Sequence, residues 1–216
     1  MNILARMLHI ILPIHCIGCG RRGIAFCDGC IAHAPLANTS EADWIHAHFS
    51  YKDAMVRKAL RALKYKYRMP IGLVLAGALY GDVLEFVSEA RELYPDRQFM
   101  IMGIPSSRES QKERGFNQSE VIAKEIVRLF EDSAVVFVPN VLEKIKSTER
   151  QARIEKRSDR LKNLVGAYRV RKPDIISGAH VIVIDDITTT GATFKEARRA
   201  LKAAGAKTVT AFAVAH

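Results

Sequence analysis

The sequence predicts an α/β fold in which helices flank a largely parallel sheet, with a small four-cysteine module at the N-terminus. Strand-like and helix-like stretches alternate along most of the 216 residues, which is typical of strands joined by crossover helices. Residues 179–186 (AHVIVIDD) are apolar up to their two acids, as in strands buried on both faces of a parallel sheet. All four cysteines lie between positions 16 and 30. We therefore expect an N-terminal helix and zinc-binding module at 1–40 and an α/β domain at 41–216.

Residues 1–16 (MNILARMLHIILPIHC) are expected to form a short amphipathic helix. An export signal is the alternative, because Arg6 precedes an apolar stretch. However, His9 and Pro13 interrupt that stretch, which is too short to cross a bilayer and lacks small residues before a cleavage site. We therefore expect a cytoplasmic protein without membrane insertion.

The cysteines form two C-x-x-C pairs in CIGCGRRGIAFCDGC, residues 16–30. Four thiolates at this spacing can close a tetrahedral shell around zinc, and the glycines between them permit tight turns. Such a site is structural, because four protein ligands leave no open position for chemistry. Two disulfides are the alternative, but disulfides suit an exported chain. We expect a structural zinc ion held by Cys16, Cys19, Cys27 and Cys30.

The rest of the chain alternates between the two kinds of element after a polar linker at 36–44. Apolar side chains recur at helical spacing from Met55 to Leu63, and a second apolar helix begins at Pro70. The expected strands are 44–51, 99–105, 134–139, 179–186 and 207–215, and the expected helices are 53–63, 70–84, 119–130 and 195–204.

The charge balance favours anionic ligands. Lys and Arg number 33 against 23 Asp and Glu, which gives a net charge of +10. A surface of this sign attracts phosphate-rich small molecules or nucleic acid, and the charge alone does not choose between them.

The most informative stretch is VIVIDDITTTGAT, residues 181–193. Asp185 and Asp186 end a buried strand at the sheet edge where α/β proteins bind ligands, and two adjacent carboxylates need solvent, a metal or hydroxyl groups. The turn that follows offers hydroxyls and backbone amides for a phosphate. Its candidate ligands are Thr188, Thr189, Thr190, Gly191 and Thr193. A ribose 5-phosphate would satisfy both the acid pair, through its hydroxyls, and the threonine turn, through its phosphate. The alternative is that the acids cap the helix and the threonines only fill a turn.

This stretch resembles the PRPP-binding signature of type I phosphoribosyltransferases. The segment IPSSRESQKERGFNQSE at 104–120, the LKY at 63–65 and the cysteine module are similar to the ComF family, which has a type I phosphoribosyltransferase fold. The resemblance implies that Asp185 and Asp186 bind the ribose hydroxyls and that the threonine turn binds the 5-phosphate. It also implies Mg²⁺ bound with PRPP.

The loop after the 99–105 strand lies at the same expected sheet edge as the acid pair. In related phosphoribosyltransferases this loop holds the pyrophosphate, which implies that role for Ser106, Ser107 and Arg108. Further candidates for contact with substrate or DNA are Lys64, Arg114, Asn117 and Gln118. The alternative is a solvated basic loop in which Asn117 caps the next helix.

A basic stripe is expected at 146–160 if that segment is helical. Its members are Lys146, Arg150, Arg153, Arg157 and Arg160, and such a stripe can follow a nucleic-acid backbone. We include Arg150, Arg153 and Arg157 among the candidate DNA contacts. The alternative is a solvated helix face, because Glu149, Glu155 and Asp159 lie nearby.

Two functional hypotheses follow. The first is a phosphoribosyltransferase that binds PRPP with Mg²⁺, with no acid or base assigned as catalytic, and that is associated with DNA uptake in natural competence, as the resemblance to ComF implies. The second is a non-catalytic module that binds single-stranded DNA or other DNA-uptake proteins and in which PRPP is absent or regulatory. The sequence does not identify the ribosyl acceptor.

Overall fold

The computed structural model describes residues 14–38, 42–65, 69–95, 97–131, 133–145 and 165–216. In these residues a five-stranded sheet has the order β1-β7-β6-β2-β3, and each pair of neighbours is parallel. Its strands are β1 (Ile45–Phe49), β2 (Phe99–Gly103), β3 (Val135–Phe137), β6 (His180–Ile187) and β7 (Thr208–Ala215). The predicted α/β fold with a parallel sheet is confirmed.

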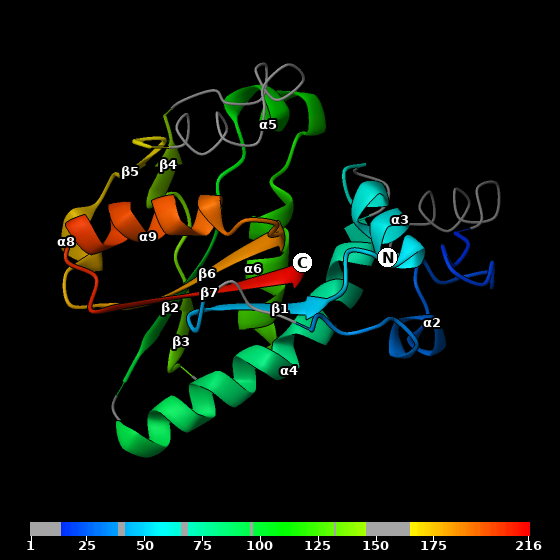
Figure 1. Cartoon of the computed structure of the whole chain (residues 1–216), viewed down its shortest axis with the longest axis horizontal. Coiled ribbons are helices and arrows are strands. Elements are labelled where there is room, and N and C mark those ends of the chain that lie inside the picture. Colours follow the sequence, from blue (N-terminus) through cyan, green and yellow to red (C-terminus); the bar gives the residue numbers. More distant parts are fainter. Residues whose placement is uncertain (1–13, 39–41, 66–68, 96, 132, 146–164) are drawn as a thin grey trace, which may run out of the picture.

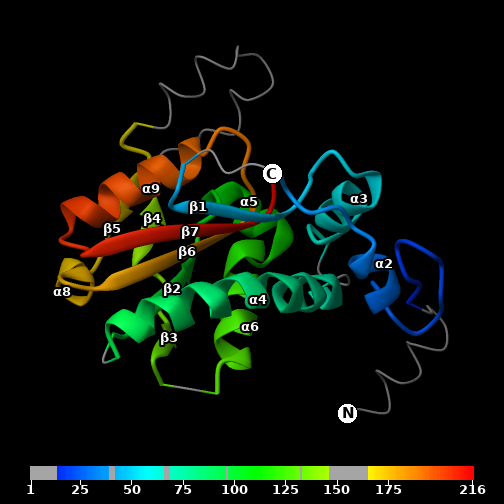
Figure 2. The ribbon, with the colours of Figure 1, turned by 60° about the horizontal axis from the view of Figure 1, so that its bottom comes forward.

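Helices cover both faces of the sheet, as Figures 1 and 2 show from two directions. On one face lie α4 (Met69–Leu93) and α6 (Gln118–Leu129), and on the other lies α9 (Ala192–Ala203). Two short strands, β4 (Leu142–Lys144) and β5 (Tyr168–Val170), form a separate antiparallel pair on the α9 side. Helix α8 (Pro173–Ile176) precedes β6.

The central strand β6 is apolar on both faces from Val181 to Ile184 because each face meets helices. Ile182 and Ile184 of β6 belong to the cluster that contains the buried residues of α4 and α6, whereas Val181 and Val183 belong to the cluster that contains those of α9. Successive side chains of a strand point to opposite faces, so a strand buried on both sides must be apolar at every position. This accounts for the apolar run that precedes the acid pair.

The cysteine module packs against the rest of the described chain. It includes α2 (Asp28–Ala32), and its Phe26 and Ile17 belong to the same hydrophobic cluster as α3 (Ala54–Ala62) and α4. The Lys58 ammonium of α3 donates a hydrogen bond to the Ile17 carbonyl at 2.7 Å. The division of the chain near residue 40 remains a prediction.

Several elements differ from the expected pattern. The segment expected as a loop after β2 contains α5 (Arg108–Arg114), which begins because the Ser107 hydroxyl accepts from the Ser110 N–H and ends at Gly115 with φ 75°. Helix α4 continues to Leu93 because Phe86 and Val87 carry its apolar face past Glu85. The expected helices at 1–16 and 146–160 fall largely or wholly outside the described residues.

Helix α4 is long and apolar enough to cross a membrane by length and composition. Its residues Ile71, Leu75, Leu79 and Val83 are buried in the core against α6 and the sheet. Core helices pass the same test, and packing in this fold accounts for the apolar residues on the buried face of α4.

Candidate functional site

The acid pair lies at the carboxyl end of β6, in the centre of the sheet. The Ser119 hydroxyl of α6 donates a hydrogen bond to Asp185 Oδ1 at 2.7 Å, and the Asp186 N–H donates to the same oxygen at 2.9 Å. These two donors fix the Asp185 carboxylate. Ser119 was not among the predicted site residues, and its only sequence signal is its place one residue after Gln118, at the start of a helix.

Both carboxylates are held in surroundings that disfavour their charge. Burial raises the pKa of Asp185 well above its ordinary value, and the charge of Asp186 raises it further. Burial also raises the pKa of Asp186, although the positive charges of Lys64 and Arg114 oppose that shift. Hydroxyl donors or a cation bound at this edge would reduce the free-energy cost of keeping both carboxylates ionised.

The threonine turn leads from β6 into α9. Thr188 is buried, and its N–H donates to the Ala215 carbonyl of β7 at 2.9 Å. Gly191 is the N-cap residue with φ 63°, a left-handed conformation that glycine adopts without a steric penalty, and no side chain caps the helix. Neither acid of the pair therefore caps α9. An uncapped N-terminus beside threonine hydroxyls is suited to a phosphate.

The end of β2 lies beside the end of β6. The Ile104 N–H donates to the Ile184 carbonyl at 2.8 Å, and the Asn117 amide donates to the Ile104 carbonyl at 2.9 Å. Asn117 is the N-cap residue of α6 by position, but its side chain makes no capping bond, so the alternative in which Asn117 caps this helix does not describe this structure. These bonds place the start of α6 at the same edge as Asp185.

The loop predicted to hold pyrophosphate starts here. The Ser106 hydroxyl is buried and has no hydrogen-bond partner among the described residues. Ser107 caps α5, and Arg108 is the first residue of that helix. A buried hydroxyl without a partner is costly in a folded protein, which favours a ligand oxygen at this point.

Three more of the predicted residues are close to one another or to the acids. Arg114 donates from Nη1 to Gln118 Oε1 at 3.2 Å, and the charges of Arg114 and Lys64 both act on Asp186. Gln118 is only 3% exposed, and its Nε2 has no partner among the described residues. The predicted DNA contacts Arg150, Arg153 and Arg157 lie outside the described residues.

The four cysteines form a second, separate cluster. Their sulfur atoms all lie within 4.8 Å of one another, and the Cys27 sulfur lies 3.6 Å from those of Cys16 and Cys19. A tetrahedral zinc site with bonds of about 2.3 Å places neighbouring sulfurs about 3.8 Å apart. All four cysteines are free, so the disulfide alternative does not describe this structure. The cluster fits a tetrahedral metal ion.

The protonation of the thiols is uneven. Burial raises the pKa of Cys16, but the backbone N–H groups of Cys19, Cys27 and Gly18 outweigh burial and lower this pKa to about 6. Hydrogen bonding to Cys27, together with burial, raises the pKa of Cys30 to about 12. Four thiolates so close together repel one another, and a bound Zn²⁺ would remove that repulsion.

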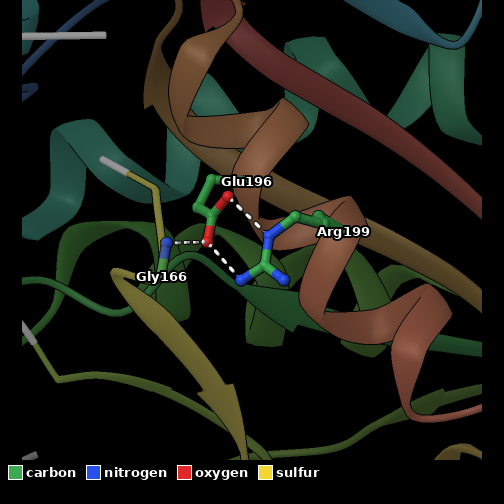
Figure 3. A network of polar contacts seen from close by, with 3 residues as sticks. All are labelled: Gly166, Glu196 and Arg199. Carbon is green, nitrogen blue, oxygen red and sulfur yellow. Dashed lines mark hydrogen bonds and ion pairs between the residues drawn. The ribbon is translucent and has the colours of Figure 1, made fainter. Parts of the chain in front are cut away.

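A buried acid on α9, Glu196, holds the backbone at Gly166, just before β5. Glu196 accepts the Gly166 N–H at 2.6 Å and two hydrogen bonds from Arg199, as Figure 3 shows. The hydrogen bonds from Arg199 lower the pKa of Glu196, and they outweigh burial, which raises this pKa. The sequence analysis did not identify Glu196. Its only signal is an acid three residues before an arginine on one helix face.

Comparison with known proteins agrees with this geometry. Residues 116–216 match the model of the phosphoribosyl transferase domain. The chain is 32% identical over 153 residues to competence protein ComFC of Bacillus subtilis (strain 168), an alignment that covers 71% of this chain and 55% of that protein. It is 30% identical over 157 residues to DNA utilization protein YhgH of Escherichia coli (strain K12), covering 69% of this chain and 62% of that protein.

A further relative is competence protein ComFC of Streptococcus pneumoniae (strain ATCC BAA-255 / R6), with 33% identity over 129 residues, 60% of this chain and 52% of that protein. The chain thus spans somewhat more than half of the length of these relatives. The four-cysteine cluster, the parallel sheet and the domain match lead to one conclusion: the chain belongs to the ComF family, with a type I phosphoribosyltransferase fold.

Proposed function

We propose that the carboxyl edge of β6 and β2 binds PRPP together with Mg²⁺. The observation that supports this proposal is that three features lie at one edge of the sheet. They are the Asp185–Asp186 pair, the N-terminus of α9 without a side-chain cap, and, in the loop after β2, the buried Ser106 hydroxyl, which has no partner among the described residues. A ligand with hydroxyls, a phosphate and a second anionic group supplies what each part lacks.

Each part of PRPP has a candidate partner. The ribose hydroxyls donate to Asp185 and Asp186, and the 5-phosphate accepts from the α9 N-terminus. The hydroxyls of Thr188, Thr189, Thr190 and Thr193 and the backbone of Gly191 complete that phosphate cradle. The pyrophosphate lies against Ser106, Ser107 and Arg108. The acid pair and the PRPP oxygens are the hard oxygen ligands that Mg²⁺ prefers, and the ion would neutralise charge on the pyrophosphate.

The biological role that we propose is DNA uptake or DNA utilisation, as the relatives' names indicate. In this role the chain acts in the cytoplasm with other DNA-uptake proteins, and the cysteine module holds a structural zinc ion. The packing of that module against α3 and α4 supports a structural use of the metal rather than a catalytic one.

Isothermal titration calorimetry tests the proposal. Wild-type protein should bind PRPP in the presence of Mg²⁺ at a ratio of one to one, and the double variant Asp185→Asn/Asp186→Asn should lose at least a hundredfold in affinity. The exposed acid Glu89, on α4, gives a charge control: Glu89→Gln should bind as the wild type does. Equal affinity in the wild type and the double variant would rule out the proposed role of the acids.

A second candidate function is binding of single-stranded DNA without catalysis. The net charge of +10 and the relatives' names favour it. If phosphate contacts carry this binding, the logarithm of the association constant must fall linearly with the logarithm of the salt concentration. A pyrophosphate-release assay with a panel of bases separates the two candidates, because a regulator binds PRPP without releasing pyrophosphate.

A further inference from the structure

The side chain of Gln118 has an unsatisfied donor beside the acid pair. Gln118 is 3% exposed, and its Nε2 has no hydrogen-bond partner among the described residues. The next residue, Ser119, binds the Asp185 carboxylate, so Gln118 lies at the start of α6, where that helix meets the acid-bearing strand. An amide N–H buried without an acceptor is destabilising in a folded protein.

The orientation of the Gln118 amide follows from its neighbour. The Arg114 guanidinium can only donate hydrogen bonds, so the atom 3.2 Å from Arg114 Nη1 must be the amide oxygen. The NH₂ group is therefore the one without a partner. Arg114 thus fixes Gln118 as a donor toward whatever group lies against Nε2.

Charges of both signs lie near this amide, and the one in direct contact with it is positive. Arg114 contacts the amide directly, and the positive charges of Arg114 and Lys64 also act on the nearby Asp186 carboxylate. A ligand group held here meets an N–H donor next to positive charge. Such surroundings suit an oxygen that only accepts, such as an oxo or carboxylate oxygen, and disfavour an amino group, which would bring a second donor.

We propose that Gln118 selects the ribosyl acceptor by an oxo or carboxylate oxygen, an inference that rests on the proposed binding of PRPP. In the transfer, a nitrogen lone pair of the acceptor forms the bond to C1 of the ribose. The bond from C1 to the pyrophosphate oxygen breaks, and its electron pair leaves with pyrophosphate. An acceptor nitrogen that carries a hydrogen loses that proton to water, whereas a pyridine nitrogen has no proton to lose and becomes a pyridinium. Gln118 and Arg114 orient the acceptor and take no proton.

The test uses matched pairs of small acceptors with the full chain, PRPP and Mg²⁺. The pairs are hypoxanthine with adenine, uracil with cytosine, and nicotinate with nicotinamide. In each pair the first compound has an acceptor oxygen where the second has an amino group. Binding is measured by saturation-transfer NMR, and turnover by release of pyrophosphate. The wild type should prefer the first member of at least one pair by tenfold or more.

The variant Gln118→Glu makes the test specific. One carboxylate oxygen keeps the contact with Arg114, and the other replaces the NH₂ donor by an acceptor, so the preference should reverse toward the amino compound. Because the variant adds a negative charge near the acid pair, the wild type and the variant are compared at saturating PRPP. The control is Gln111→Glu, the same change at an exposed position of α5, which should leave the preference unaltered.

The outcomes separate this inference from the function on which it rests. If the wild type does not bind PRPP, the proposed function is wrong and the inference falls with it. If the wild type binds PRPP but discriminates within none of the pairs, or if Gln118→Glu keeps the original preference, the inference alone is wrong.

Discussion

Like ionisable groups lie close together both in the cysteine cluster and in the acid edge, which is the carboxyl edge of β6 and β2 that carries Asp185 and Asp186. The two regions differ in what surrounds those groups. In the cluster, four sulfurs face one another within 4.8 Å and complete a closed shell for one ion. At the carboxyl edge of β6 and β2, the two carboxylates lie in the same region as two buried polar atoms, Ser106 Oγ and Gln118 Nε2, that have no hydrogen-bond partner among the described residues. An ion with four protein ligands has no free coordination position for a second ligand. Donors without partners, in contrast, can still form hydrogen bonds to a ligand that binds and dissociates.

This difference separates a site for stability from a site for binding. The cysteine module shares its hydrophobic cluster with α3 and α4, so an ion held by the four sulfurs would support part of the core. The acid edge is stabilised by the strand and helix ends around it, and its ionised carboxylates are unfavourable until a ligand is bound. Removing the ion should therefore cost stability, and removing an acid should cost binding only.

The largest effect is expected from breaking the cysteine cluster. Cys27 lies 3.6 Å from two other sulfurs, so Cys27→Ser should abolish stoichiometric zinc and lower the free energy of unfolding by about 3–5 kcal/mol. Metal analysis and urea unfolding measure the two effects. Stoichiometric metal in the wild type is the required starting point. A variant that unfolds at the wild-type urea concentration would show that the module does not support the core.

The next effect tests how closely α6 must approach β2. A Cβ atom at Gly103 would lie 2.5 Å from backbone atoms of Ser119 and Glu120, and backbone atoms cannot move aside cheaply. Gly103→Ala should lower the free energy of unfolding by about 2–3 kcal/mol and weaken PRPP binding, since it displaces Ser119. Gly77→Ala is the matched control: no atom lies within 4 Å of its added methyl, and alanine in a helix stabilises by about 0.5–1 kcal/mol. Equal stability of the two variants would contradict the close approach.

A smaller effect is expected at the hydroxyl that positions Asp185. Ser119→Ala removes the 2.7 Å hydrogen bond to Oδ1 and should weaken PRPP binding about tenfold, because the ionised carboxylate loses a donor. The affinity of Ser119→Ala should also depend more steeply on pH, since losing that donor raises the pKa of Asp185 further. Calorimetry at pH 6.5 and pH 8.5 measures both. An unchanged affinity at both values would show that Ser119 does not position the acid.

The smallest effect concerns stability and pH in the absence of ligand. The pKa of Asp185 is raised in the folded protein, so its favourable contribution is present when it is protonated and is lost as pH rises through that pKa. Asp185→Asn stays neutral and should raise the free energy of unfolding by about 1 kcal/mol at pH 8, with a smaller gain at pH 5. Urea unfolding at the two values measures it. A variant less stable than the wild type at pH 8 would contradict the account of the acid pair.

Much of this fold follows from local sequence patterns. The strand at 179–186 is recognisable because burial on both faces requires apolar residues throughout, and the C-x-x-C spacing predicts a cluster that the structure assembles. Helix α5 was not predicted, since it has no apolar face and depends on the Ser107 cap and on Gly115. The short strands β4 and β5 carry too few residues for a periodic signal, and each forms through its pairing with the other.

The residues of the candidate site are visible in the sequence, but the contacts between them are not. Adjacent acids and a threonine turn are visible in one stretch of sequence, and the structure places them between β6 and α9. The bond from Ser119 to Asp185 joins residues 66 positions apart, and the Glu196 bond to Gly166 joins residues 30 apart. Such contacts depend on how helices pack on the sheet, which no local pattern encodes.

The most direct measurement of the central claim is a crystal structure of the chain soaked with PRPP and Mg²⁺. It should have the 5-phosphate against the turn at 188–193, the ribose hydroxyls within hydrogen-bond distance of Asp185 and Asp186, and the pyrophosphate near Ser106. PRPP bound elsewhere on the molecule, or an edge left empty at saturating ligand, would contradict the claim that this edge binds a phosphorylated ribose.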